Sequence, residues 1–187
     1  MFFTKSLFGK SKIQDITPNI PIVSEESNSH KLDDNLKEKL TEIYSTKKDY
    51  YKKEFMNISK CYDCGINVVK PIHISKNVLV MEFVGIDGKP EKNLLESKVG
   101  KNDYHQSLKI ISDLYHKVNL VHGDFSEYNI FKTTDGLIVF DLGSAVDFRH
   151  PNSNEFLKRD ISNITKFFNK RGIQVEDPEK LFKEITK

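Results

Sequence analysis

Cysteine is nearly absent from this sequence, which contains two in 187 residues. The C-x-x-C spacing of Cys61 and Cys64 occurs in redox and zinc sites. A structural zinc site, however, needs a second pair of such ligands, and the sequence has none. We therefore interpret the pair as reduced intracellular cysteines near the end of a helix.

The sequence also lacks a large excess of one charge and any long apolar run. Its 29 Lys and Arg residues and 27 Asp and Glu residues leave a formal net charge of +2, which gives no reason to propose a nucleic-acid groove. No apolar stretch approaches the length of a membrane-spanning helix. Residues 1–12 are basic but contain neither Arg nor a long apolar core, so we expect no secretory signal and see only a weak indication of an organelle transit signal. We expect a soluble globular protein that needs no membrane.

The order of helix and strand signals predicts an α+β chain. Prolines and a Ser/Glu/Asn cluster in residues 1–32 predict a flexible arm, with at most one short strand at residues 20–23. A helical pattern then runs from Asp33 to a stop at Gly65, with a possible break at residues 45–46. Its inward face is expected to carry Leu36, Leu40, Ile43, Tyr51, Phe55, Ile58 and Tyr62.

Beyond that helix, β-prone residues predict a hairpin of strands at 72–74 and 78–84, joined by a turn at 76–77. A short helix is expected at 93–97, and longer helices at 102–117, 154–170 and 178–186, the last with a proline in its first turn. The pair Asp135-Gly136 predicts a second hairpin between two short strands.

One stretch, residues 120–141, carries the chemistry. Asp124 follows His122 and Gly123, Asn129 comes five residues later, and Asp141 ends a short apolar run and is followed by Leu142-Gly143. This is the H-x-D-x-x-x-x-N … D-x-G order of a kinase-type site. Phosphoryl transfer needs one carboxylate to orient and deprotonate the acceptor hydroxyl, and a second carboxylate with a neutral oxygen ligand to hold Mg²⁺. Asp124, Asp141 and Asn129 are of these types, in this order.

These residues and their neighbours resemble the RIO-type atypical serine/threonine protein kinases, from about Tyr50 to the C-terminus. The resemblance is carried by the segments YKKEFMN (51–57), NVLVMEFVG (77–85), LVHGDFSEYNI (120–130) and RHPNSNEFLKRDISNITKFF (149–168). The last segment is the most specific, because ordinary protein kinases place a long activation loop and an A-P-E motif there and this sequence has neither. The tail, residues 172–187, resembles the first RIO subfamily, which we favour, whereas the H-G-D-F of the loop resembles the second.

The resemblance implies a protein-kinase-like (RIO) fold and assigns roles by position. Asp124 corresponds to the catalytic aspartate, and Asn129 and Asp141 correspond to the magnesium ligands. In this family the aspartate at the position of Asp141 has also been assigned as a transient phosphoryl acceptor, so it counts as catalytic too. The backbone of the hinge, with Met81, Glu82 and Val84, is expected to bind the adenine ring of ATP.

Other residues near these positions have two interpretations each. Glu54 corresponds to the helix glutamate that pairs with a phosphate-binding lysine, or it is a solvated helix residue. We expect His122 to support the loop by hydrogen bonding rather than to act as a base. Ser126 is typical of the family but has no catalytic role that we can assign. Ion pairs of Arg149, His150, Arg159 and Asp160 are expected to tie the last helices to the loop.

The resemblance has one gap. A kinase covers the phosphates with a Gly-rich loop and binds them with a lysine on the following strand. Before Glu54 the only glycine is Gly9, and neither the family's serine-threonine-glycine signature nor an Ala-x-Lys strand is present. The lysines at 47, 48, 52 and 53 lie in the helical pattern and suit a solvated face. We therefore expect a flexible arm at 1–32, a truncated N-lobe at 33–84 with the long helix, hairpin and hinge, and a RIO-type C-lobe at 85–187.

Three functions compete. The first is an ATP- and Mg²⁺-dependent serine/threonine kinase or ATPase; the family then implies maturation of the small ribosomal subunit, in the cytoplasm and also the nucleus, with the pre-ribosomal particle as a partner. The second is a catalytically impaired RIO-like binding module, which the missing phosphate loop favours. The third is another compact kinase-like phosphotransferase, such as the small kinase of the tRNA-threonylcarbamoylation complex, which also carries an H-G-D loop, but the block from His150 to Leu157 disfavours it.

Overall fold

The computed structural model describes the backbone of residues 2–5, 34–76 and 78–187, and the side chains of residues 49–76 and 78–187. Within these ranges the chain is α+β, as predicted. Its elements are β1 (Phe2–Lys5), α1 (Asp34–Asp63), β2 (Pro71–Ser75), β3 (Val78–Glu82), β4 (Gly85–Ile86), β5 (Lys89–Pro90), α2 (Lys101–Val118), β6 (Leu120–Val121), β7 (Ile130–Lys132), β8 (Leu137–Val139), β9 (Val146–Asp147), α3 (Ser153–Lys170) and α4 (Pro178–Ile185).

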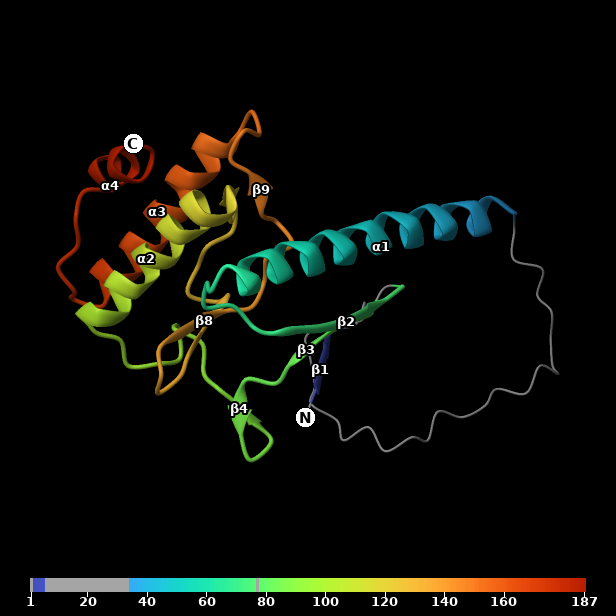
Figure 1. Cartoon of the computed structure of the whole chain (residues 1–187), viewed down its shortest axis with the longest axis horizontal. Helices are drawn as coiled ribbons and strands as arrows, with labels where there is room; N and C mark the ends of the chain where they lie inside the picture. Colours follow the sequence, from blue (N-terminus) through green and yellow to red (C-terminus); the bar gives the residue numbers. More distant parts are fainter. Residues whose placement is uncertain (1, 6–33, 77) are drawn as a thin grey trace.

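A three-stranded sheet of order β1-β3-β2 lies beneath the long helix α1 (Figure 1). The predicted hairpin is confirmed, because β2 and β3 pair in antiparallel fashion and Lys76 takes a positive φ of 52° in the turn between them. The prediction of an irregular arm at residues 1–32 is wrong at its start, where Phe2–Lys5 forms β1 and Phe3 stands opposite Met81. The edge of β3 that β2 leaves free offers backbone hydrogen-bond partners to Phe2–Lys5. The sequence of residues 2–5 alone does not indicate this pairing. Residues 6–33, with Gly9, Asp33 and the expected strand at 20–23, lie outside the described residues.

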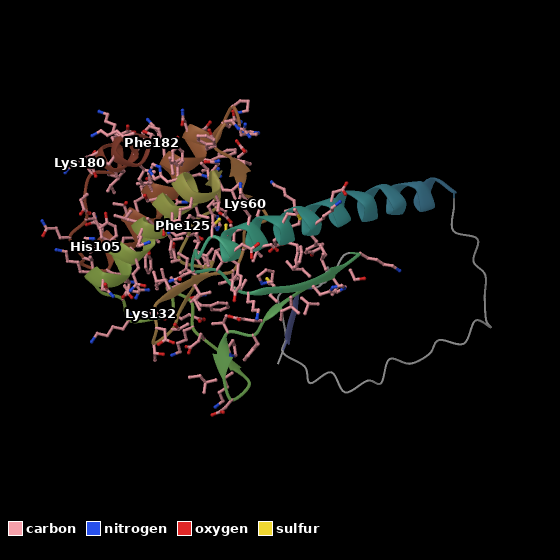
Figure 2. All side chains as sticks on the ribbon, in the orientation of Figure 1. Lys60, His105, Phe125, Lys132, Lys180 and Phe182 are labelled. Carbon is pink, nitrogen blue, oxygen red and sulfur yellow. The ribbon has the colours of Figure 1, made fainter. Side chains whose placement is uncertain are left out.

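Helix α1 runs without a break from Asp34 to Asp63, so the predicted interruption near residues 45–46 is wrong. It ends where predicted, since Gly65 takes a positive φ of 70° that few other residues adopt cheaply. Tyr51 and Ile58 face the core as expected, but Tyr62 is exposed and Cys61 takes the inward place beside Ile58. The Nζ of Lys60, labelled in Figure 2, donates to the Val118 carbonyl at the end of α2, 2.5 Å away.

The two cysteines are free, Cys61 buried and Cys64 exposed. This agrees with their interpretation as an unbridged pair near a helix end. Burial raises the pKa of the Cys61 thiol to about 12, so this sulfur stays protonated and is a poor nucleophile or metal ligand.

The segment after the sheet forms turns instead of the short helix expected at residues 93–97. The Leu94 N–H donates to the carbonyl of Ile130, 3.0 Å away, and Asn93 bridges to Phe131. The Asn93 side chain also accepts the Glu96 N–H at 3.1 Å. These bonds compete with helical ones, as short polar side chains often do, and they fasten the linker to β7.

The three remaining helices form a layer of their own, in which α2 and α3 run side by side and α4 packs against α3 (Figure 1). All three were predicted within a residue or two. The Asp103 carboxylate caps α2 by accepting the Gly100 N–H at 2.7 Å, and Asp177 caps α4 with Pro178 in its first turn. Among the described residues no helix is both long and apolar enough to cross a membrane.

Candidate active site

The stretch predicted to carry the chemistry lies between the helical layer and the sheet under α1. Residues 122–129 form an irregular loop between β6 and β7, and β8 returns beside β7. The turn joining these two strands contains Asp135-Gly136, as predicted, with the Thr133 N–H donating to the Gly136 carbonyl at 2.9 Å. Figure 2 labels Phe125 at the centre of this region, and its side chain is fully buried. The loop is therefore anchored at its middle as well as at both ends.

The β7–β8 pairing brings two of the predicted site residues together. Ile130 stands opposite Val139, and the Phe140 N–H donates to the Asn129 carbonyl at 3.2 Å. Asp141 therefore follows a residue whose backbone is bonded to Asn129. The Asp141 carboxylate itself accepts the Gly143 N–H at 3.1 Å, which holds the first turn of the segment after β8.

Asn129 is bonded to the predicted catalytic aspartate. Its Nδ2 donates to the Asp124 carbonyl at 2.9 Å and to Asp124 Oδ2 at 3.2 Å. With the amide nitrogen engaged on Asp124, the amide oxygen is the end of Asn129 that can serve as a ligand. Asp124 is exposed and Asp141 is partly exposed, so solvent and substrates reach both carboxylates.

His122 is buried next to both carboxylates. Desolvation lowers the pKa of its imidazole to about 4, although the negative charges of Asp141 and Asp124 act in the opposite direction. Its Nδ1 accepts the Asp124 N–H at 3.3 Å, which requires an unprotonated Nδ1. A neutral buried imidazole in this position holds the loop and is badly matched to take a proton at pH 7, as the expected supporting role requires.

Gly123 beside it has a positive φ of 77°, and a Cβ there would lie 3.0 Å from the Ser144 carbonyl oxygen. No larger residue fits that turn without strain.

Two residues of helix α3 hold the loop by hydrogen bonds to its backbone. Asp160 is buried and accepts the N–H groups of Gly123 at 2.8 Å and Phe125 at 2.9 Å, while the Arg159 guanidinium donates to the Gly123 carbonyl. Burial raises the pKa of Asp160 to about 6, against the two N–H donors that lower it. The predicted tie between the last helices and the loop therefore exists, but it runs through backbone hydrogen bonds and not through ion pairs.

The other two residues expected in that tie lie elsewhere. Arg149 pairs with Asp147 at 2.8 Å on the surface, and the His150 ring stacks on Phe156. Arg149 therefore binds a residue of β9, and the His150 ring lies against a residue of α3. The sequence alone did not distinguish Arg149 and His150 from Arg159 and Asp160, the two residues that do bond to the loop.

A cleft opens where the hinge was predicted, with about 820 Å³ of empty space including its open side. Met81, Glu82 and Val84 all line it, although Met81 is 98% buried and acts mainly as core. Backbone bonds shape the hinge: the Glu82 N–H donates to the Lys70 carbonyl at 2.9 Å and the Glu91 N–H to the Val84 carbonyl at 3.0 Å. The remaining lining residues are Val69, Phe83, Pro90, Glu91, Asn93, Glu96, Phe131 and Phe140.

Sequence reasoning missed the two aromatic residues of this cleft. Phe131 and Phe140 stack with their ring centroids 4.1 Å apart and their planes 26° apart. Phe131 belongs to β7 and stands two residues after Asn129, and Phe140 follows β8 directly before Asp141. The signal was present, because side chains on paired strands that are cross-strand neighbours share a face. An apolar cleft with a flat aromatic wall suits a planar base.

The C-terminal part of α1 lies over the segment that follows β8. The Asn57 Nδ2 donates to the Leu142 carbonyl at 3.0 Å, and the Tyr50 hydroxyl occupies the space that a Cβ on Gly143 would need. Glu54 is fully buried, so its interpretation as a solvated residue is wrong. Lys52 and Lys53 are exposed, in agreement with the predicted solvated face, whereas the side chains of residues 47 and 48 are outside the described set.

The donor set around Asp141 fits magnesium. Mg²⁺ takes one or two protein oxygens and completes its shell with phosphate oxygens and water, and here a carboxylate and an amide oxygen are available from adjacent strands. Within the described part of the chain, no group of three or more His, Cys, Asp or Glu side chains is arranged to hold a metal ion. The residues therefore suit a metal that arrives with a nucleotide and not a closed structural site.

A hinge cleft beneath a helix, an H-x-D loop and a D-x-G segment on a strand hairpin define a protein-kinase-like fold. The RIO domain family matches residues 24–181 of this chain. The chain belongs to the RIO domain family.

Named relatives agree with this membership. The chain is 38% identical over 138 residues to a RIO-type serine/threonine-protein kinase Rio1 of Haloferax volcanii, covering 73% of this chain and 47% of that protein. It is 35% identical over 138 residues to the Rio1 of Thermoplasma acidophilum, covering 74% and 73%. It is 34% identical over 143 residues to the rio1 kinase of Dictyostelium discoideum, covering 74% and 25%. The chain thus spans about half the length of the first of these relatives, and less of the third.

Solved structures agree on the fold. The Rio2 kinase of Chaetomium thermophilum, in a complex described as ADP/Mg²⁺-phosphoaspartate, superimposes with a TM-score of 0.60 at 24% identity, covering 73% of this chain and 44% of that one. The predicted RIO-type kinase fold is confirmed. The division of the chain at residues 32 and 84, and the roles of individual site residues, stay predictions.

Proposed function

We propose that this chain binds ATP with Mg²⁺ and transfers the γ-phosphoryl group to a serine or threonine hydroxyl. The observation that carries the proposal is the bonding of Asn129 to Asp124 by its side chain and to Phe140 by its backbone. These bonds join the H-x-D loop to the strand pair β7–β8, whose Phe131 and Phe140 line the hinge cleft. Membership in a family whose named members are serine/threonine kinases supports the same class of reaction.

The chain's own residues have distinct tasks in this proposal. The hinge backbone at Glu82 and Val84, with Phe131 beneath, binds the adenine. Asp141 and the amide oxygen of Asn129 hold the metal, which neutralises phosphate charge when bound. Asp124 accepts the proton of the acceptor hydroxyl, and its backbone is kept in place by His122. If water or the Asp141 carboxylate attacked the γ-phosphorus of ATP in place of a substrate hydroxyl, the same site would act as an ATPase. The kinase and the ATPase reaction would use the same residues.

The test is nucleotide binding followed by turnover. The 187-residue chain is titrated with Mg²⁺-ATP by calorimetry, beside Asp141→Asn and the control Asp135→Asn, which removes the same charge from the exposed hairpin turn. We expect the wild type and the control to bind equally and Asp141→Asn to lose the dependence on Mg²⁺. Failure of the wild-type chain to bind Mg²⁺-ATP, or identical Mg²⁺ dependence in all three proteins, would contradict the proposal.

A catalytically impaired binding module is the second candidate. It is favoured by the exposure of Lys52 and Lys53 on α1, which keeps these lysines out of the hinge cleft. Because binding and orienting the phosphates is most of the catalysis, a site without a phosphate lysine is expected to turn over slowly. Phosphate release or peptide phosphorylation that disappears in Asp124→Ala would exclude this candidate.

The family resemblance also leads us to propose a place in small-subunit maturation, with a pre-ribosomal particle as partner, in the cytoplasm and nucleus. Co-sedimentation of the tagged chain with precursor particles of the small subunit, and its absence from mature ribosomes, is the expected result. A chain found only at the top of the gradient would contradict this role without bearing on the phosphoryl transfer.

A further inference from the structure

A second hollow lies on the other side of the catalytic loop. It has about 900 Å³ of empty space including its open side, and it is separate from the hinge cleft, with which it shares no lining residue. Three elements form it: the loop residues Ser126 to Tyr128, the last turns of α3, and Leu95 from the turn after β5. Its lining is completed by Asn163, Lys166, Phe167, Lys170 and Arg171.

Among the residues that line this hollow are two apolar residues and an exposed aromatic ring. Phe167 is buried and Leu95 is exposed, while the Tyr128 side chain is 56% exposed although it lies between Asp124 and Asn129 in the sequence. A large exposed aromatic beside a hollow is typical of a binding surface, because its burial against a partner releases water. In the free chain nothing described covers Tyr128.

The charge of the hollow is one-sided. Lys166, Lys170 and Arg171 line it together with a single acidic residue, Glu127. Lys166 and Lys170 are four residues apart on α3 and therefore lie on the same face of the helix. Among the described residues, no ion pair is formed by either lysine, whereas Lys158 on the same helix pairs with Glu179. Three cations against one carboxylate leave the hollow with a net positive charge, and the two lysines, as like charges one turn apart, repel each other, which favours an anionic partner.

Arg171 is positioned in advance. Its guanidinium donates to the Leu95 carbonyl at 2.6 Å and lies 5.2 Å from the centre of the Phe167 ring. These contacts hold the planar group at the edge of the hollow and reduce the entropy lost when it binds an anion. Basic residues at the end of α3 also stabilise the helix by complementing its dipole, but that effect explains neither the hollow nor the exposure of Tyr128, and Lys166 lies more than one turn from the end of α3.

The distance between the hollow and Asp124 indicates which kind of anion the hollow binds. Ser126 and Tyr128 follow Asp124 by two and four residues, so their Cα atoms lie at most roughly 7 and 14 Å from that of Asp124. An extended peptide advances about 3.3 Å per residue, so the hollow is no more than about four residues from a hydroxyl held at Asp124. We propose that this hollow binds acidic side chains of the protein substrate, within about four residues of the serine or threonine that is phosphorylated. This inference rests on the proposed kinase function for the identity of the acceptor.

The test measures peptide binding directly, so that it does not depend on turnover. A labelled nonapeptide with a central Ser and flanking Asp and Glu residues is titrated with the 187-residue chain by fluorescence anisotropy, beside the same peptide with Asn and Gln in place of the acids. Two or three partly exposed charge contacts predict an about five- to tenfold tighter binding of the acidic peptide. Equal binding of the two peptides would overturn the proposal.

Variants locate the preference. Lys166→Ala/Lys170→Ala is expected to bring the ratio of the two affinities close to one. The matched control Lys180→Ala/Lys183→Ala removes the same charge from the outer side of α4, where Figure 2 labels Lys180, and is expected to keep the ratio. A ratio that survives in the first variant, or falls equally in the control, would show that the acids bind elsewhere.

Two further readings separate this proposal from others. A single-stranded RNA of the same net charge is titrated in parallel; if it binds more tightly than the acidic peptide and depends on Lys166 and Lys170, the hollow is a nucleic-acid site and the peptide proposal is wrong. The Mg²⁺-ATP titration described above is made on the same preparations. If the chain binds no nucleotide but prefers the acidic peptide, the proposed kinase function is contradicted. The selectivity of the hollow for anions is then still supported.

Discussion

The side-chain amide of Asn129 donates to Asp124 twice, to the backbone carbonyl at 2.9 Å and to Oδ2 at 3.2 Å. Through these bonds one residue orients the carboxylate that is proposed to accept the substrate proton and offers its own oxygen to the metal. Both tasks require a side-chain amide, because its nitrogen donates hydrogen bonds and its oxygen accepts them or binds a metal.

Asn129→Asp should therefore be more damaging than its small size change suggests. The new carboxylate would face the carbonyl and carboxylate of Asp124 without a donor between them, and it would displace the geometry of both. We expect a fall of about 100-fold or more in the rate of phosphate release or peptide phosphorylation, comparable to removing a preorganised group from an active site. Asn102→Asp, at an exposed position of α2, is the matched control; equal rates in the two variants would contradict the assigned role.

Asp160→Ala should destabilise the fold and loosen the loop. The substitution leaves the N–H groups of Gly123 and Phe125 without their acceptor in a buried place, at a cost of about 1–3 kcal/mol for each unsatisfied group. Urea unfolding should show a midpoint lowered by an amount equivalent to about 2–6 kcal/mol at unchanged slope. Asp135→Ala in the exposed turn is expected to stay within about 0.5 kcal/mol of the wild type, and a similar value for Asp160→Ala would argue against the clasp.

Two buried groups should give the stability opposite slopes with pH. Asp160 has a pKa raised to about 6, so between about pH 4 and 6 the folded chain binds a proton that the unfolded chain has lost, and its contribution to stability declines as the pH rises. His122 has a pKa lowered to about 4, so between about pH 6.5 and 4 the unfolded chain binds the extra proton, and stability declines as the pH falls.

Unfolding curves from pH 4.5 to 7 separate the two groups. Relative to the wild type, Asp160→Asn should lose the contribution to the free energy of unfolding that declines with rising pH. His122→Gln should lose the contribution that declines with falling pH. Each difference has an upper limit of about 1.4 kcal/mol per pH unit. A pair of variants whose profiles run parallel to the wild type would show that neither group titrates in the folded chain as described.

Phe131→Ala should weaken nucleotide binding. The ring lies on one wall of the hinge cleft and stacks on Phe140, and stacking of a base on an aromatic side chain is worth about 1–3 kcal/mol. Titration with Mg²⁺-ADP should show a Kd about 5- to 100-fold higher than that of the wild type. Tyr62→Ala removes an exposed aromatic ring from α1 and is expected to leave the Kd unchanged; a Phe131→Ala variant that binds equally well would place the adenine elsewhere.

Local chemistry was enough to predict several elements. The turn at Asp135-Gly136, the end of α1 near Gly65 and the start of α4 at Pro178 all depend on the backbone preferences of the residues at those points, and all appear where predicted. The motif order predicted a kinase-type site, and the resemblance of the segments around it to the RIO kinases predicted the RIO-type fold, which is confirmed.

Local chemistry failed where a distant partner decides. Tyr62 fits the helical pattern, yet Cys61 faces the core, since the inward direction of α1 depends on the layer that packs against it. Residues 93–97 favour a helix in isolation but bond to β7 instead. Strand β1 exists because β3 has a free edge at which Phe2–Lys5 can pair.

The sequence by itself determined which residue types stand at the site and in what order, because a D-x-x-x-x-N loop and a D-x-G turn place their own side chains within a few residues of one another. Only the tertiary structure decided that Phe131 and Phe140 form one wall, that Asp160 holds the loop by two N–H groups, and that cations of α3 meet Tyr128 in a second hollow. The physical reason is that these contacts join segments about 10 to 45 residues apart, and hydrogen bonding and burial at such separations follow from the packing of whole elements and not from the preferences of neighbouring residues.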